Sequence, residues 1–341
     1  MNTLVLMTAL IPTTGHADII RFAASLPDSE VKVLLSGRSH EPYSADLRAD
    51  ALREELCSLT NVTIRVHHDD HAPQNPGDMD GFWEWWADTI NTSYPDVETW
   101  SAVVASEPYG AHVADSLHAR FIPYDISRSI NPVKGQAVRD NLWEQWLQVI
   151  PPFRKHLQYS AVIFGQESVG KTTVSRAVSE ALQAQWLMEY ARPYLEEVGA
   201  EVTGEKMETI QRGQYALQES SHAVAPTPAV IMDTDLFSTV GYYRIWAGEA
   251  PAECVTLALR SPGDMYFILP DTVPFVEDQL RYGDGVRESS TGFWVDLLEE
   301  YGLPYMLVPS GSVEDKTRFI AERVREGFEE KTREVRVFER E

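Results

Sequence analysis

The sequence predicts an α/β protein with two parallel-sheet domains, because two patterns typical of such sheets follow one another along the chain. In the first half, short apolar runs alternate with helical stretches, which indicates a parallel sheet covered by helices. In the middle, residues 165–172 read GQESVGKT, a complete phosphate-binding loop. The length of 341 residues is that of about two domains, so each pattern is given a domain of its own.

The first half contains five apolar runs that are predicted to be strands. These strands are expected at Leu4–Leu10, Val31–Leu35, Val62–Val66, Ala102–Ala105 and Ala119–Ile122. Helical spacing is found at Ala17–Ala24, Ala45–Leu56 and Ala111–Leu117. A further helix is expected at Phe82–Ile90, whose three tryptophans either pack in a core or offer a ring for stacking.

The phosphate-binding loop has the structural context that the motif requires. Tyr159–Phe164 is an apolar strand that ends at the first glycine, and Thr172–Leu182 has helical spacing. A glycine-rich turn in front of a helix directs backbone N–H groups and the helix dipole at one anion. The predicted ligand is ATP with Mg²⁺. The residues expected to bind the phosphates and the metal are Gly165, Gly170, Lys171 and Thr172.

An acidic pair follows the apolar run Ala229–Met232, where the chain reads Asp-Thr-Asp at 233–235. Carboxylates at the carboxyl end of a parallel strand lie where open α/β sheets bind ligands. We therefore expect Asp233 or Asp235 to hold Mg²⁺ together with Thr172, and one of the pair to accept a proton from a substrate hydroxyl. The alternative is a turn in which these residues cap the next helix.

The first strand is followed directly by Thr-Thr-Gly-His at 13–16 and then by a helical pattern. Such a turn can hold ATP, because the threonine and histidine side chains converge on the triphosphate together with the helix N-terminus. Thr13, Gly15 and His16 are therefore candidate ATP ligands, with His16 stabilising charge on the α-phosphate. The alternative is that His16 is an exposed or capping residue.

The composition of the chain indicates which binding partners and which cellular compartment are expected. A net charge of −23 argues against binding to nucleic acid or to anionic membranes. No segment has the ~18 uninterrupted apolar residues of a membrane span, and Met1–Leu10 lacks the basic residues of a signal peptide. Cys57 and Cys254 lie far apart and form no metal-binding or redox spacing, so a cytoplasmic protein is expected.

Three further segments occur in an order that resembles one known family. Residues 105–110 read ASEPYG, residues 122–128 read IPYDISR and residues 133–141 read VKGQAVRDN, and the phosphate-binding loop with Gln-Glu-Ser comes next. This order resembles the NadR family, in which a nicotinamide-nucleotide adenylyltransferase is fused to a ribosylnicotinamide kinase. The resemblance extends over residues 4–320.

The resemblance implies a Rossmann-like nucleotidylyltransferase domain at 1–156, a P-loop kinase domain at 157–325 and a charged tail at 326–341. It implies that nicotinamide riboside is phosphorylated with ATP to nicotinamide mononucleotide (NMN), which is then adenylylated with ATP to NAD and pyrophosphate. The partners would be these small molecules, with a homo-oligomer left open. The DNA-binding segment that precedes the first domain in some relatives is not expected, because the first strand begins at residue 3.

The resemblance also assigns residues to the two reactions. In the kinase domain, Glu189 and Arg192 would contact the riboside or its phosphate, with a surface ion pair between them as the alternative. Arg281 and Arg287 would lie on a lid over the transferring phosphate, or else in an ordinary solvated loop.

In the first domain the NMN phosphate is already an anion, so no side-chain base is needed. The remaining assignments are Asp278, which would bind substrate, and Arg139, which would stabilise phosphate charge with Thr13, His16 and Mg²⁺.

Two departures from the family pattern concern the first domain. The chain runs through Met7–Pro12 without the family's glycine, and Lys134 and Gln136 replace a serine and a threonine. One alternative is therefore an active P-loop nucleoside kinase with a degenerate, nucleotide-sensing N-terminal domain. Two others are a phosphopantetheine-type transferase fused to a nucleoside kinase, and a P-loop switch that senses nucleotide without catalysis. The base of the phosphate donor and the preferred nucleoside stay open.

Overall fold

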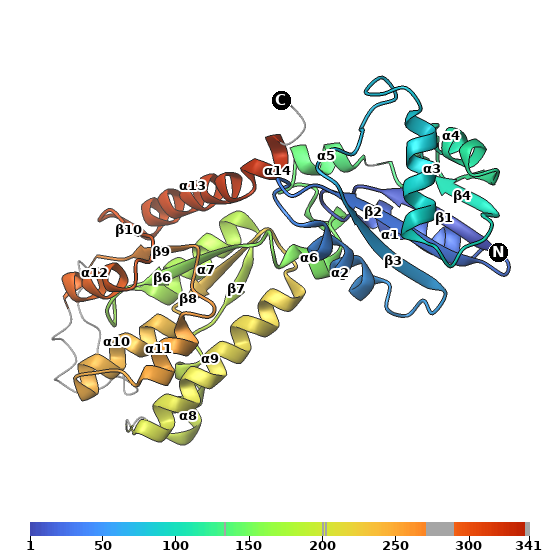
Figure 1. Ribbon diagram of the computed structural model, residues 1–341. Coiled ribbons are helices and arrows are strands. Elements are labelled where there is room, and N and C mark those ends of the chain that lie inside the picture. Colours follow the sequence, from blue (N-terminus) through green and yellow to red (C-terminus); the bar gives the residue numbers. More distant parts are fainter. Residues whose placement is uncertain (133, 200, 202, 271–289, 338–341) are drawn as a thin grey trace. The chain divides into compact units, whose positions relative to one another are not determined.

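The chain folds into two compact units, each built on one parallel sheet. The computed structural model describes residues 1–132, 134–199, 201, 203–270 and 290–337. Contacts divide the chain into Met1–Arg154 with Arg333–Glu341 as the first unit, and Lys155–Thr332 as the second. Each unit contains a five-stranded sheet in which all strand pairs are parallel (Figure 1). The predicted α/β class with two parallel sheets is confirmed.

The sheet of the first unit has the strand order β3-β2-β1-β4-β5. Each predicted strand is present, although β1 ends at Met7 and the next residues leave the sheet instead of continuing to Leu10. The direction of the order reverses between β1 and β4, and in open sheets such a switch point opens a crevice at the carboxyl ends of the strands. The strands are β1 (Asn2–Met7), β2 (Glu30–Gly37), β3 (Val62–His68), β4 (Ala102–Ala105) and β5 (Arg120–Pro123).

Helices between these strands supply the rest of the first core. Leu4, Leu34 and Val103 of the strands lie in one buried cluster with Ile90 and Val113 of the helices. Each such side chain stabilises the fold by about 1.5–3 kcal/mol relative to an exposed one. The helices are α1 (Thr14–Ala24), α2 (Ala45–Glu55), α3 (Phe82–Ser93), α4 (Tyr109–Ser116), α5 (Gly135–Asp140), the 3-10 turn η1 (Trp146–Gln148), α6 (Pro151–Arg154) and α14 (Arg333–Val337), which packs on α5.

The aromatic helix α3 packs into the fold. Phe82 and Trp86 are buried in a small cluster with Ala72. Trp83 stacks on His112 of α4, with ring centroids 4.9 Å apart. Of the two interpretations of the tryptophans, core packing therefore describes Trp86.

The sheet of the second unit has the order β10-β9-β6-β8-β7, with β6 at its centre and every residue of β6 buried. Its strands are β6 (Tyr159–Phe164), β7 (Gln185–Leu187), β8 (Ala229–Asp233), β9 (Met265–Ile268) and β10 (Tyr305–Leu307). Its helices are α7 (Lys171–Leu182), α8 (Ala191–Val198), α9 (Gly204–Val224), α10 (Leu236–Ala247), α11 (Ala252–Ala258), α12 (Thr291–Glu300) and α13 (Val313–Lys331). No helix within the described residues combines the length and apolar character that crossing a membrane requires.

The boundary expected at residue 325 does not coincide with a break in the structure. Helix α13 continues through it, and Phe328 is buried. At the end of α13, Lys331 Nζ donates to the carbonyl of Gln158 at 2.7 Å and to the carboxylate of Asp264 at 2.8 Å. Residues 326–331 are thus part of a packed helix of the second unit, because an apolar stripe continues along α13 among the charges that suggested a tail.

The second core is centred on Trp294 of α12, which is fully buried. Phe164 of β6 meets the Trp294 ring edge-on, with centroids 5.1 Å apart. Helix α10 approaches the same ring at Gly241, where an added Cβ would lie 2.3 Å from Trp294 Cζ3. A residue without a side chain is therefore required at this crossing.

Gly241→Ala is expected to destabilise the protein by about 1–3 kcal/mol, because the new methyl group overlaps the Trp294 ring. The higher helix propensity of alanine, worth about 0.5–1 kcal/mol, does not offset this overlap. The measurement is the urea midpoint of unfolding. Gly204→Ala, whose Cβ would meet nothing within 4 Å, is the control and should keep the wild-type midpoint. Equal midpoints for the two variants would contradict the packing argument.

Candidate functional site

The phosphate-binding loop of the second unit lies between β6 and α7, as its sequence predicts. Gly165 and Gly170 have φ angles of 123° and 90°, which favour glycine, and Ser168 has a φ of 69°. An added Cβ at Gly165 would lie 3.2 Å from the carbonyl oxygen of Leu269. Alternation of such left-handed residues with ordinary ones turns backbone N–H groups toward a common concave centre, which is an anion-binding arrangement.

Lys171 and Asp233 place opposite charges beside this loop. Lys171 Nζ donates to the carbonyls of Gly165, at 3.1 Å, and Gln166, at 2.8 Å. Asp233, at the end of β8, is 2% exposed, and burial raises the pKa of its carboxyl, against the hydrogen bond from Thr172 and the charge of Lys171. Its Oδ1 atom is buried and has no hydrogen-bond partner among the described residues.

A buried carboxylate oxygen without a donor fits a metal ligand. Mg²⁺ is usually bound by one or two carboxylates, a hydroxyl, water and the phosphates of the substrate. Asp233 and Thr172 provide such a partial set beside the loop. Elsewhere in the described part of the chain, no group of three or more His, Cys, Asp or Glu is arranged to hold a metal by itself.

Asp235 has a different environment from Asp233, although only one residue, Thr234, separates them. Its Oδ1 accepts the backbone N–H of Phe237 at 3.0 Å and caps α10, and its Oδ2 accepts the Tyr266 hydroxyl at 2.5 Å. Burial raises the pKa of Asp235 to about 7, although these hydrogen bonds oppose the shift. The capping alternative weighed from the sequence therefore describes Asp235, and Asp233 is the carboxylate that faces Thr172.

A pocket of about 370 Å³ extends from this loop. Lys171 and Thr172 of the loop line it together with residues of α8, α9 and α10. Glu189 and Arg192, both expected to bind substrate, line the pocket, and burial raises the pKa of the Glu189 carboxyl against the nearby charge of Lys171. Its other lining residues include Leu195, Met207, Ile210, Gln214, Asp235, Ser238, Thr239 and Tyr242. Asp278, Arg281 and Arg287, the other predicted residues, lie outside the described residues.

The Thr-Thr-Gly-His turn of the first unit begins α1 at the carboxyl end of β1. The backbone N–H of Thr13 donates to His16 Nδ1 at 3.0 Å. Since a backbone N–H can only donate, Nδ1 must accept, and the proton of the neutral ring is on Nε2. Burial, with the charges of Arg139 and Arg48, lowers the pKa of His16 to about 4. His16 is therefore a neutral hydrogen-bond donor at neutral pH.

Arg139 lies beside His16 on the short helix α5. Its guanidinium donates to Gln136 Oε1, and Gln136 Nε2 donates to Asp140 at 2.9 Å. Gln136, which departs from the family pattern, thus orients Arg139.

Both Arg139 and His16 line a second pocket of about 360 Å³ at the switch point between β1 and β4. Its other lining residues include Thr8, Ala9, Thr13, Gly15, Ser106, Glu107, Asp125, Arg128 and Asn131.

The two other motifs of the first unit brace this pocket through their own contacts. Arg128 pairs with Glu107 at 3.1 Å, which joins the ASEPYG and IPYDISR segments. Asp125 accepts three backbone N–H groups from the loop that leads to α5, at 2.6–3.0 Å. The Tyr109 hydroxyl donates to the carbonyl of Leu6 in β1 at 3.0 Å. These residues hold the rim in place, so their presence in the motif has a structural reason.

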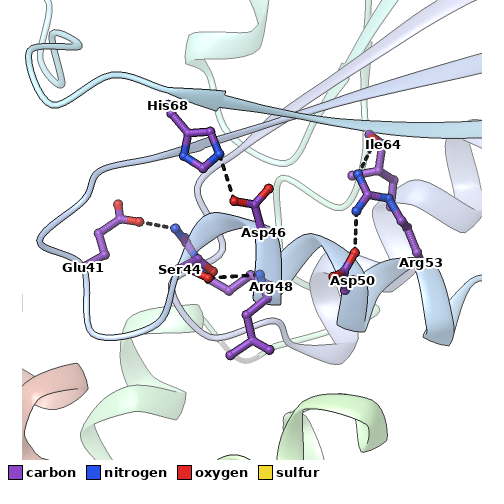
Figure 2. A network of polar contacts seen from close by, with 9 residues as sticks. Glu41, Ser44, Asp46, Arg48, Asp50, Arg53, Ile64 and His68 are labelled. Carbon is purple, nitrogen blue, oxygen red and sulfur yellow. Dashed lines mark hydrogen bonds and ion pairs between the residues drawn. The ribbon is translucent and has the colours of Figure 1, made fainter.

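A buried arginine that sequence reasoning missed supports the turn after β1. Ala9, in the Met7–Pro12 segment that lacks the family's glycine, adopts a φ of 48°. The carbonyl of the preceding residue, Thr8, accepts Arg48 Nη1 at 2.6 Å. Arg48 of α2 is completely buried, pairs with Glu41 and donates through Nε to the carbonyl of Ser44 at 3.3 Å (Figure 2). In the sequence Arg48 is one charge among several on a polar helix, and nothing there marks it as buried.

The fold defines a class, a two-domain α/β protein with a Rossmann-like domain and a P-loop domain, each of which contains a pocket. Comparison with known proteins agrees. The model of a family described as an AAA domain matches residues 160–316. The chain is 22% identical over 341 aligned residues to the trifunctional NAD biosynthesis/regulator protein NadR of Escherichia coli (strain K12), covering 92% of this chain and 80% of that protein. NadR of Salmonella typhimurium is 21% identical with the same coverage.

Solved structures give the same result for the fold. A crystal structure of NadR in complex with NR has a TM-score of 0.69 and 22% identity, and covers 96% of each chain. A second, of NadR in complex with NAD and AMP-PNP, has the same TM-score and coverage at 21% identity. The chain is homologous to NadR over most of its length, as the resemblance of its motifs predicted, and the two solved structures show that it shares their fold.

Arg48→Met is expected to lower the free energy of unfolding by about 3–5 kcal/mol, because it leaves Glu41 buried without its partner. The double variant Arg48→Met, Glu41→Leu should recover most of that loss, since it removes both charges. The measurement is urea unfolding. Arg212→Met, at an exposed ion pair with Glu208, is the control and should change stability by less than about 1 kcal/mol. If Arg48→Met lowered the free energy of unfolding as little as the control does, Arg48 would not be the necessary partner of a buried Glu41.

Proposed function

We propose that this chain is a bifunctional NAD-salvage enzyme. The second unit phosphorylates nicotinamide riboside with ATP to NMN, and the first unit adenylylates NMN with ATP to NAD and pyrophosphate. The observation that supports this best is that one chain homologous to NadR contains two separate pockets, each built on a phosphate-binding turn. The NadR structures with NR, and with NAD and AMP-PNP, contain ligands that these two reactions use or form. Its proposed compartment is the cytoplasm.

In the proposed kinase reaction, the loop binds the ATP phosphates and the riboside occupies the far end of the pocket. Lys171 lies within reach of the β- and γ-phosphates, where its charge offsets the charge that develops during transfer. Thr172 and Asp233 would hold Mg²⁺, which when bound neutralises phosphate charge. Glu189 lines the same pocket, where its carboxylate can accept a hydrogen bond from the attacking 5′-hydroxyl.

In the proposed adenylyl transfer, the NMN phosphate attacks the α-phosphorus of ATP and pyrophosphate leaves. The nucleophile is already an anion, so the first unit needs donors and positive charge rather than a base. Neutral His16 supplies a donor through Nε2, and Arg139, held by Gln136, supplies the charge. Because the pKa of His16 is about 4, this donor keeps the same protonation state throughout the neutral range.

The alternative is that only the kinase is active and the first unit senses nucleotide. The absence of the family's glycine from Met7–Pro12 favours this alternative. Against it, Ala9 in this segment adopts a left-handed conformation, and the pocket of the first unit is about as large as that of the second. Gln136 also takes a role in orienting Arg139. We therefore favour two active sites.

The test is an end-point assay of the purified protein with ATP, Mg²⁺ and nicotinamide riboside, in which products are resolved by chromatography. NAD should form through NMN. Lys171→Ala is expected to abolish riboside phosphorylation and leave NMN adenylylation intact, because the lysine acts only in the loop of the second unit. His16→Ala should reduce NMN adenylylation by about 100-fold or more and leave the kinase intact.

Each variant serves as the control for the other, and circular dichroism would establish that both are folded. NMN that accumulates without NAD in the wild-type protein would favour the kinase-only alternative. Loss of both activities from either folded variant would refute the model of two separate sites. No consumption of riboside by the wild-type protein would reject the proposed substrate.

The two aspartates after β8 should respond differently to the same change. Asp233→Asn is expected to reduce kcat of riboside phosphorylation by about 100-fold or more, because it weakens the metal ligand. Asp235→Asn should keep kcat within about three-fold, because its amide oxygen still caps α10 and the site disfavours charge. Steady-state kinetics with varied Mg²⁺ would measure both. A larger loss in Asp235→Asn than in Asp233→Asn would reverse the assignment.

A further inference from the structure

Three buried glutamines lie along one side of α9, and two of them use their amide N–H groups within the protein. Gln211 Nε2 donates to the carbonyl oxygen of Cys254 at 2.7 Å, and Gln218 Nε2 donates to the carbonyl of Ser261 at 3.4 Å. A buried amide group without a partner is costly, so such bonds are expected. These two glutamines connect α9 to α11 and to the loop that follows it.

Gln214 lies between them and differs. Its Oε1 accepts the backbone N–H of Tyr190 at 2.8 Å. Because this N–H can only donate, the amide cannot be turned around, and its orientation is fixed. Gln214 is 3% exposed, and in the part of the chain that the structure describes its Nε2 atom has no hydrogen-bond partner.

The unused donor belongs to the wall of the P-loop pocket. Gln214 lines the pocket together with Met207 and Ile210 of the same helix. Tyr190, which fixes the amide, directly follows Glu189, a carboxylate that lines the same pocket. This wall therefore presents a fixed neutral donor, an acidic acceptor and apolar side chains that limit the access of water.

We propose that Gln214 Nε2 donates a hydrogen bond to an uncharged oxygen of the nucleoside that receives the phosphate, a ribose hydroxyl or a carboxamide oxygen. This inference rests on the proposed kinase function of the second unit. A neutral amide suits an uncharged acceptor, because it brings no countercharge to a wall that already contains Glu189. Without substrate the donor is unpaired, so a nucleoside that lacks the acceptor oxygen leaves it unpaired and is discriminated against.

The test compares Gln214→Met with Gln211→Met, two substitutions of buried amides one turn apart on α9. Gln214→Met should raise KM for nicotinamide riboside by about ten-fold, the effect of one hydrogen bond, with KM for ATP within two-fold of wild type. Gln211→Met should lower the thermal midpoint without a selective effect on KM for the riboside. Gln214→Glu, assayed at pH 8, keeps an acceptor for the Tyr190 N–H and removes the donor, so it should show the same rise in KM even if Gln214→Met does not fold.

Substrate analogues identify the oxygen. The wild-type protein is assayed with 2′-deoxy and 3′-deoxy nicotinamide riboside and with a pyridine riboside that lacks the carboxamide. With the wild-type protein, the analogue that lacks the partner oxygen should have a KM about ten-fold higher than that of nicotinamide riboside. With the Gln214 variants, the KM of this analogue should be no higher than that of the riboside.

Three results would overturn the inference. The first is an unchanged KM for the riboside in Gln214→Glu, and the second is an equal rise of that KM in Gln211→Met and Gln214→Met. The third is that every analogue raises KM, relative to the riboside, by the same factor in the variants as in the wild-type protein. A wild-type protein that phosphorylates no riboside would reject the proposed function and the inference with it, a result that the wild-type assay separates from the other three.

Discussion

Both candidate sites depend on the same constraint: a parallel strand must end in a turn that bends the backbone into the N-terminus of a helix. In the second unit, Gly165 and Gly170 take the positive φ angles of that turn without strain. In the first unit Ala9 takes one, which costs about 1–2 kcal/mol for a residue with a side chain. The buried guanidinium of Arg48 holds the adjacent carbonyl of Thr8 and so offsets this cost.

The buried polar groups around the two sites fall into two kinds, those whose hydrogen-bonding atoms are paired within the protein and those that retain an unpaired atom beside a pocket. Arg48 and Glu41 satisfy one another, and Asp235 is bonded to Phe237 and Tyr266. Such groups fix positions and leave little capacity for a ligand. Asp233 and Gln214 each retain one buried atom for which the described residues supply no partner, and both lie beside the P-loop or its pocket. Since an unpaired buried polar atom is costly, its retention at a pocket points to a ligand that completes it.

Membership of a sequence motif does not by itself make a residue a ligand. Arg128 pairs with Glu107, Asp125 binds the backbone of the following loop, and Tyr109 is bonded to Leu6 of β1. These contacts hold together the rim of the pocket that His16 lines. The motifs therefore supply both polar groups that line the pocket, at His16 and Arg139, and the contacts that hold their surroundings in place.

The sequence alone determined the two parallel sheets, the phosphate-binding loop and its family, because strand periodicity, glycine turns and helix starts are local properties of the chain. It also placed Asp233 and Asp235 at the end of a strand, but it could not tell which of the two caps the next helix. That distinction depends on Tyr266, which is 31 residues away from Asp235. The roles of Arg48 and Gln214 were likewise decided by partners brought close only on folding, Thr8 and Tyr190. Tertiary structure decided which polar groups are satisfied, since burial and hydrogen bonding between distant segments leave no pattern in the local sequence.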